Sequence, residues 1–227
     1  MRDKIKDVAN DLLIMHGFRG LRFGDIAKKL KITRANIHYH FGTKSKLVDE
    51  VIVQYLTRTI KEMGAVWESD RSYEEKVIAT MELNRRRYLR FNKDSAISGA
   101  PWSLISRMRL DADLLSRSAR TQLRAFSVTM ERFVANAIEE AQATGEIAPD
   151  APARDIGVQI VSIIDSAGPI TQDAGSFARL QHLYLAHNRV IAHAYSKRKR
   201  YPPTDQGDRV VEPQFAGAAM TTRSRVK

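Results

Sequence analysis

The sequence predicts an all-helical protein, and three observations support that fold class. Apolar residues recur three and four positions apart over most of the chain, which is the spacing of one helical face. No segment of useful length alternates apolar and polar residues as a half-buried strand does. Threonine, glycine and proline stand where the periodic segments begin and end, as helix caps and breaks require.

Four helices are expected within residues 1–63. The first has its apolar stripe before Gly17, which is a natural stop, and the second covers 23–30. Thr33 is expected to cap a short third helix, because a threonine hydroxyl accepts a free backbone N–H of the first turn. Thr43 offers the same cap to a long fourth helix.

The remaining periodic segments predict a larger helical bundle. A helix is expected over 72–92, followed by a break over 92–103 that contains glycine and proline. Later helices are expected to end near Gly145 and to cover about 154–172 and 176–196. The periodic segments therefore divide the chain into three parts: a head of short helices at 1–47, a larger helical domain at 48–196, and a basic disordered tail at 197–227.

The net charge of +11 is concentrated at the two ends of the chain. Residues 1–50 hold 11 Lys/Arg against 6 Asp/Glu, and residues 196–227 hold 8 against 3. A basic N-terminal segment favours nucleic-acid binding because phosphates attract local positive charge, although a solvated basic surface is an alternative. The absence of cysteine excludes disulfides and thiolate metal sites. No segment resembles a membrane span or a signal peptide, so a cytoplasmic protein is expected.

Residues 23–41 carry the strongest functional signal. Ala27 is a small residue where two helices can cross, and Ile32 and Ile37 supply apolar contacts between them. This spacing is typical of a helix-turn-helix, whose second helix enters the major groove of double-stranded DNA. With Ile37 and Phe41 facing inward, the outward side carries donors and acceptors suited to base edges and phosphates. These outward residues are Arg34, Asn36, Tyr39 and His40. An ordinary helical hairpin with a polar outer face is the alternative.

Residues 9–52 resemble the N-terminal DNA-binding domain of the TetR family of transcriptional regulators. The positions that carry the similarity are Ala9, Gly17-Phe18, Asp25-Ile26-Ala27, Ile32-Thr33, His38-Tyr39-His40-Phe41, Thr43-Lys44 and Leu47. The resemblance implies that 1–47 is a DNA-binding domain and 48–196 a ligand-binding and dimerisation domain. It implies a homodimer in which the helices at 154–172 and 176–196 pair with their counterparts as a four-helix bundle. It further implies a palindromic operator, and a repressor that a small-molecule effector releases from DNA.

The resemblance also implies roles for individual residues. The recognition helix would be lined by Thr33, Arg34, Ala35, Asn36, Tyr39 and His40. Lys44, at the start of the fourth helix, would hold a DNA phosphate. The chain departs from the family pattern at three places, one of which is His38, where tyrosine is commoner. Leu21-Arg22 replaces a hydroxyl cap, so Arg22 is expected to contact phosphate instead. Lys31 replaces a turn glycine and must either tolerate its backbone geometry or shift it.

An effector pocket is expected inside the bundle of 72–145. Asn84 lies on the apolar stripe of helix 72–92, where it either orients a ligand or is a structural asparagine. Trp102 either floors the pocket or fills the core. The candidate lining residues are Met81, Asn84, Tyr88, Trp102 and Phe126. They suit a largely apolar or aromatic molecule, and nearby arginines leave an anionic group open.

No metal, cofactor or catalytic site is expected. His182, His187 and His193 lie five and six positions apart, which does not place pairs on one helical face, so they are expected at a surface or interface. Asp165, in an otherwise apolar helix, is expected either to cap a neighbour or to lie at the edge of a dimer contact. Two other functions remain open: a helical-bundle enzyme acting on an anionic substrate, and a ligand-independent DNA-binding regulator controlled by a partner protein.

Overall fold

The computed structural model describes residues 1–93 and 99–196, and every regular element in these two ranges is helical. The all-helical prediction is therefore confirmed for the described part of the chain. The predicted tail, 197–227, lies outside the described residues, as does the middle of the predicted break. The elements are α1 (Arg2–Gly20), α2 (Phe23–Leu30), α3 (Arg34–Phe41), α4 (Lys44–Trp67), α5 (Tyr73–Phe91), α6 (Leu104–Leu110), a 3-10 turn η1 (Ala112–Leu114), α7 (Arg117–Ala143), α8 (Ala153–Asp165), α9 (Ala167–Asp173) and α10 (Ala178–Tyr195).

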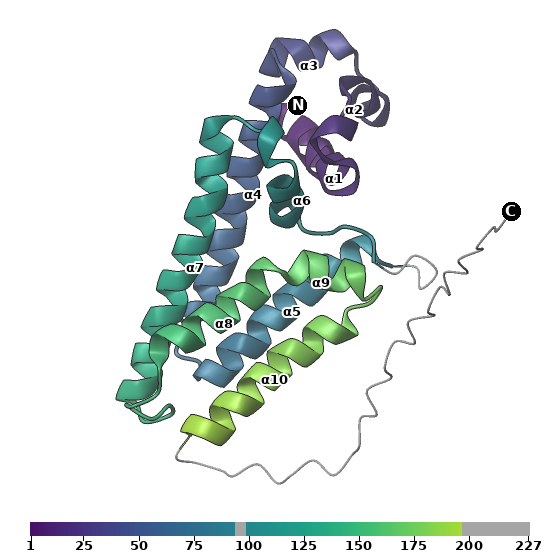
Figure 1. The fold of residues 1–227 in the computed structure, drawn as a ribbon. Coiled ribbons are helices and arrows are strands. Elements are labelled where there is room, and N and C mark those ends of the chain that lie inside the picture. The colour runs from purple at the N-terminus through teal and green to yellow at the C-terminus, as the bar shows by residue number, and fades with distance from the viewer. Residues whose placement is uncertain (94–98, 197–227) are drawn as a thin grey trace, which may run out of the picture.

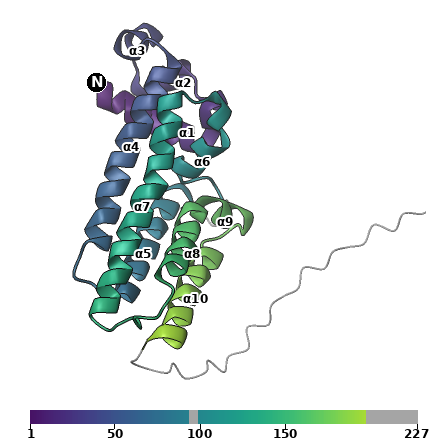
Figure 2. The same ribbon diagram turned by 60° about the vertical axis from the view of Figure 1, so that its left-hand side comes forward.

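Helices α1–α3 form a head at one end of the molecule, and α4 runs from this head into the body, which comprises α4–α10 (Figure 1). Helix α7 lies along α4, and both views show this pair connecting the head to the far end of the body (Figures 1 and 2). Helix α6 packs against α1, while α5, α8 and α10 pack together farther from the head. The predicted domain boundary at residue 47 lies inside α4.

Side-chain caps start the helices where the sequence predicted them. The Oγ1 atom of Thr33 accepts a hydrogen bond from the backbone N of Asn36 at 3.2 Å. Thr43 does the same for the backbone N of Lys46, also at 3.2 Å. Ser72 opens α5 with a reciprocal capping box, in which its hydroxyl and the Glu75 carboxylate each accept a backbone N–H.

Two features of the body differ from the expectation. Helix α6 follows directly on the predicted break and was not expected. The single helix expected at 154–172 is two helices, because α8 ends at Asp165 and α9 begins at Ala167. Pro169 explains the interruption: its ring would clash with the carbonyl of Asp165 in a continuous helix, and it has no N–H to donate there.

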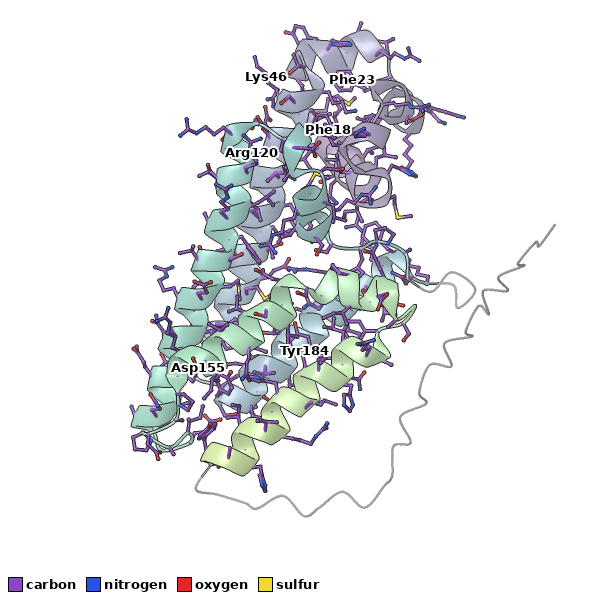
Figure 3. All side chains as sticks on the ribbon, viewed as in Figure 1. Phe18, Phe23, Lys46, Arg120, Asp155 and Tyr184 are labelled. Carbon is purple, nitrogen blue, oxygen red and sulfur yellow. The ribbon has the colours of Figure 1, made fainter. Side chains whose placement is uncertain are left out.

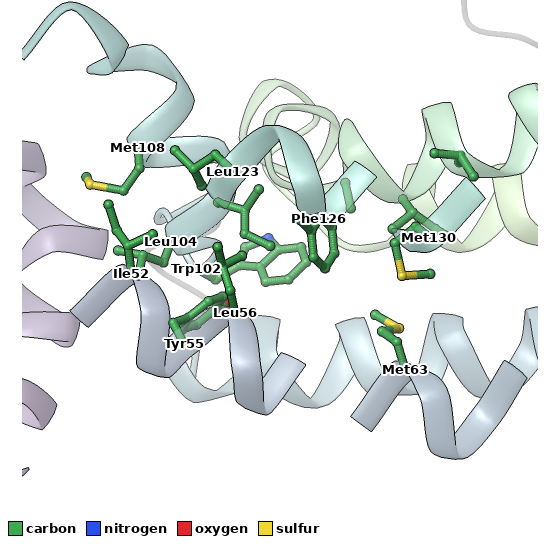
Figure 4. Packing of buried hydrophobic residues seen from close by; sticks show 14 of the residues in the cluster. Ile52, Tyr55, Leu56, Met63, Trp102, Leu104, Met108, Leu123, Phe126 and Met130 are labelled. Atoms are coloured by element: carbon green, nitrogen blue, oxygen red, sulfur yellow. The ribbon is translucent and has the colours of Figure 1, made fainter. Parts of the chain in front are cut away.

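One apolar core runs from the head into the body, from Ile5 to Ile191. Figure 4 shows part of this core between α4 and α7, with Met63 facing Phe126 and Met130. No helix among residues 1–93 and 99–196 is both long and apolar enough to cross a membrane.

Candidate functional site

The turn between α2 and α3 has the geometry that a helix-turn-helix requires. Lys31 adopts the left-handed conformation, with φ 55° and ψ 44°, so it takes the backbone geometry that favours glycine. The backbone N of Ile32 then donates to the carbonyl of Ala27 at 3.0 Å, which closes the end of α2. The predicted tolerance of Lys31 for this turn is confirmed.

Helix α3 buries one side and exposes the other. Ile37 and Phe41 are buried against the head core, whereas Tyr39 is 87% exposed. Thr33, Arg34 and Ala35 are also exposed. Asn36 and His40 are only half-buried and lie beside the exposed face, and Oδ1 of Asn36 has no hydrogen-bond partner among the described residues. The exposed polar face therefore centres on Arg34 and Tyr39.

Contacts from α1 and α2 fix α3 in place. The Arg2 guanidinium donates to the carbonyl of His40, pairs with Glu50 and lies 4.4 Å from the centroid of the Phe41 ring. Arg34 lies over α2, since a Cβ added at Gly24 would be 2.9 Å from its Nη2 atom. Both α1 and α2 therefore contribute to the orientation of the recognition helix.

Lys44 is less available than its position at the start of α4 suggests. Its Nζ atom donates to the carbonyl of Arg19 at 3.4 Å and lies 4.7 Å from the centroid of the Phe18 ring. Burial and the nearby Arg22 charge lower the pKa of Lys44, and Asp111 partly opposes them. Lys46, which sequence reasoning did not select, is exposed at the same end of the molecule as Phe23 (Figure 3). Arg22 is exposed as well.

The head meets the body at Gly17. Helix α1 extends to Gly20, but its geometry is broken at Gly17, where φ is 69° and ψ is −175°, so the predicted stop is confirmed as a kink. The next backbone N, of Phe18, donates to Oδ2 of Asp111 at 2.7 Å. A Cβ at Gly17 would lie 2.6 Å from the same oxygen. The Asp111 carboxylate, just after α6, thus stabilises the kink by accepting this hydrogen bond.

The five candidate pocket residues do not surround one ligand-sized cavity. Asn84, Trp102 and Phe126 line a cavity of about 20 Å³, far below the roughly 300–1,000 Å³ typical of small-ligand pockets. Met81 is buried, and the Tyr88 ring packs 5.4 Å from that of Phe177.

The polar groups of these candidates already have partners within the chain. Nδ2 of Asn84 donates to the Tyr184 hydroxyl at 2.8 Å, and Nε1 of Trp102 donates to Oγ1 of Thr171 at 2.7 Å. In this structure Asn84 is a structural asparagine and Trp102 fills the core.

Two further expectations for the body are corrected. His187 is buried rather than exposed, because α10 packs on α5, and its Nε2 atom is 2.8 Å from the Tyr73 hydroxyl. Asp165 accepts hydrogen bonds from Arg109 at 3.2 Å and from Ser127 at 2.8 Å, so it joins α6, α7 and α8. A single helix pattern does not reveal these partners, which come from distant segments.

Comparison with known proteins identifies the same segment as the sequence motif did. A family model described as bacterial regulatory proteins of the tetR family matches residues 5–51. The HTH-type transcriptional regulator QacR of Staphylococcus aureus is 36% identical over 52 residues, which are 23% of this chain and 28% of QacR. The negative transcriptional regulator IcaR of the biofilm operon icaADBC, from the same species, matches to the same extent. The chain thus aligns with little more than a quarter of the length of these curated relatives.

Solved structures extend the similarity to the whole fold. A TetR-family regulator from Agrobacterium tumefaciens superposes with a TM-score of 0.71 at 18% identity, covering 84% of this chain and 96% of that one. A transcriptional regulator from Saccharomonospora viridis in complex with choline gives 0.69 at 20% identity, covering 87% and 98%. At these identities the comparison establishes a shared fold, a helix-turn-helix head on a helical body.

Proposed function

Because the chain belongs to the TetR family of bacterial regulatory proteins, we propose that it is a DNA-binding transcriptional repressor that a small molecule releases from its operator. The observation that carries the proposal is the exposed polar face of α3, presented at the end of the molecule. Ile37 and Phe41 pack into the core of the head, while Arg34 and Tyr39 are exposed on the opposite side of the helix. This is the arrangement of a helix that reads the major groove.

The residues of this surface divide by chemistry into two roles. Arg34, Asn36 and Tyr39 carry the groups suited to base edges, since arginine and asparagine each bind a preferred base with two hydrogen bonds. Thr33, Ala35 and His40 complete the recognition helix. Arg22, Lys44 and Lys46 are the candidate phosphate contacts, and we give Lys46 and Arg22 the larger share because both are exposed. The Lys44 ammonium already uses one of its three N–H donors for the carbonyl of Arg19 and lies over the Phe18 ring, so it is less accessible to a phosphate.

We further propose a homodimer through α8 and α10, which places two heads on a palindromic operator. These helices pack against each other and expose apolar side chains, with Val158 on α8 and Val190 on α10 each 57% exposed. Exposed apolar surface favours an interface. Sedimentation of the full chain measures the assembly directly: a dimer supports the proposal, and a monomer at micromolar concentration contradicts it.

Selection of bound fragments from a genomic library tests the DNA-binding function, followed by gel-shift titration of the recovered site. We expect a palindromic consensus, and Arg34→Ala should weaken binding to it by about tenfold or more, because a bidentate arginine–guanine contact is lost. Arg85→Ala is the matched control, since Arg85 is an exposed arginine on α5, far along the chain from the head. Equal losses for the two variants, or no enriched sequence, would contradict sequence-specific binding.

The two alternative functions have less support. The relatives with a named role are transcriptional regulators, which favours regulation over an enzyme acting on an anionic substrate. A regulator without any ligand would show no thermal stabilisation by small molecules. The neighbour solved with choline carries a small molecule, which favours an effector here too, although the effector's class is a separate question.

A further inference from the structure

A second cavity, of about 480 Å³, lies between α1, α4 and α5 and shares Tyr55, Arg87 and Trp102 with the small cavity inside the body. Its size is within the roughly 300–1,000 Å³ typical of small-ligand pockets. Each helix contributes one face: Asn10 and Ile14 from α1, Tyr55 and Arg58 from α4, and Arg86 and its neighbours one turn away from α5. The cavity thus joins the first helix of the head to two helices of the body.

Four arginines line this cavity, and the carboxylates nearby balance only two of them. Arg87 pairs with Glu62 at 2.6 Å, and Arg90 binds both oxygens of Asp11, at 2.7 and 2.8 Å. Arg58 and Arg86 have no carboxylate partner among the described residues. Arg58 lies instead 5.7 Å from the centroid of the Tyr55 ring, which leaves its N–H donors unused. Two unbalanced guanidinium groups at one cavity favour an anion.

The rest of the lining combines three polar or charged residues, Asn10, Thr59 and Glu62, with an apolar wall. Ile14, Tyr55, Leu83, Phe91 and Trp102 line the cavity, and Figure 4 shows Trp102 lying close to Tyr55. Because the indole N–H of Trp102 already binds Thr171, the part that remains for a ligand is its ring. An apolar wall of this kind accommodates a hydrocarbon or aromatic body rather than a free inorganic ion.

Asn10 adds an independent sign that a ligand belongs here. Its side chain lines the cavity and is more than nine-tenths buried. Nδ2 donates to Asp11 at 3.0 Å, but Oδ1 has no hydrogen-bond partner among the described residues. A buried polar atom without a partner is costly, and a hydroxyl or amide donor on a ligand would satisfy it.

We propose that the cavity between α1, α4 and α5 binds an amphipathic organic anion, with its carboxylate or equivalent group on Arg58 and Arg86 and its apolar body against Tyr55, Phe91 and Trp102. Such a ligand contacts the head through α1 and the body through α4 and α5. Its identification as the effector rests on the proposed function, but the binding site does not, because its test uses protein without DNA.

Isothermal titration of the full chain with 2-naphthoate tests the proposal, with 2-naphthamide as a neutral probe of nearly the same shape. We expect 2-naphthoate to bind at a single site. The amide should bind about tenfold more weakly or worse, because it lacks the charge-assisted hydrogen bonds. Arg58→Ala and Arg86→Ala should each weaken 2-naphthoate binding by about tenfold.

Arg85→Ala is the control, because it removes the same charge from α5 one residue away, and Arg85 pairs with Glu82 and does not line the cavity. Its affinity for 2-naphthoate should stay within about twofold of the wild type, since distant exposed charges are screened. Failure of 2-naphthoate to bind at millimolar concentration would overturn the proposal, as would equal affinity for the two probes. An equal loss in Arg85→Ala and Arg86→Ala would also overturn it. These variants sit at the surface, and their melting temperatures establish that each is folded.

Discussion

The polar side chains exposed on α3 of the head and those buried in the body differ in whether they have hydrogen-bond partners within the chain. On α3, Tyr39 and Arg34 face solvent with no hydrogen bond to another described side chain. In the body, Asn84 binds Tyr184, and His187 binds Tyr73 across distant helices. A polar group with a partner inside the chain stabilises the fold, whereas one without a partner is free for a ligand. Substitutions of the buried polar residues in the body should therefore change stability, and those on α3 should change binding.

The junction between the two regions should be the most sensitive point. Gly17→Ala forces a side chain into a backbone region that only glycine adopts readily, and its Cβ would meet Asp111 at 2.6 Å. The variant should also lose the bond from Phe18 N to that carboxylate. We expect a loss of about 4 kcal/mol in the free energy of unfolding, measured in urea.

Gly145→Ala is the control for that prediction. Gly145 also has a positive φ, of 74°, but nothing lies within 4 Å of an added Cβ. It should lose only about 1 kcal/mol, through backbone strain alone. Equal losses for the two variants would show that the contact with Asp111 contributes nothing.

A buried histidine makes the stability of the body depend on pH. Burial lowers the pKa of His187 to about 4, from an ordinary value of 6.5. The unfolded chain therefore binds more protons between these values, so stability is greatest above pH 6.5 and falls as the pH drops toward 4. This one group should contribute on the order of 3 kcal/mol to that fall.

Urea unfolding at several pH values tests this, with His187→Gln and His182→Gln compared with the wild type. His182 is an exposed histidine on the same helix, so its replacement should leave the pH dependence unchanged. The stability difference between wild type and His187→Gln should shrink as the pH falls from 7 to 4. A constant difference would mean that His187 titrates normally in the folded protein.

Asn84 gives a direct test of the role of buried polar residues in the body, because the sequence allowed it to be either a ligand anchor or a structural residue. Asn84→Leu leaves the buried Tyr184 hydroxyl without its donor and should cost about 2 kcal/mol. In the double variant with Tyr184→Phe the cost should be smaller than the sum of the two single losses, because neither polar group is then left unpaired. Additive losses would argue against the hydrogen bond.

The contrast between regions also explains how far the sequence could predict the molecule. The head is built from local signals: Thr33 and Thr43 cap helices three residues downstream, and the inward face of α3 follows from Ile37 and Phe41. Local signals of this kind predicted the helices and the helix-turn-helix. The partners of His187 and Asn84 lie 114 and 100 residues away in sequence, so no local pattern could assign them.

The cavity between α1, α4 and α5 was missed for the same reason. Three of its four arginines appear in the sequence as a charged face of α5, and the fourth, Arg58, lies on α4. Only the packing of α1 onto α4 and α5 places Asn10 beside them. Conversely, Asn84 and Trp102 looked like pocket residues in the sequence because their partners, Tyr184 and Thr171, lie in distant segments.

The smallest expected effect compares two lysines at the start of α4. Lys46 is exposed, whereas the Lys44 ammonium lies over Phe18 and donates to Arg19. If contacts within the chain make a lysine less accessible to DNA phosphates, Lys46→Met should reduce the steepness of log affinity for DNA against log salt by about one unit. Lys44→Met should reduce it by less. Neither change should alter sequence preference, because phosphate contacts carry no base information. Gel-shift titrations over a salt series, on operator and scrambled duplexes, measure both slopes. Since burial lowers the pKa of Lys44, its charged form is disfavoured in the fold, so Lys44→Met should keep or raise the stability of the head. A full one-unit drop for Lys44→Met would mean that its ammonium leaves α1 when DNA binds.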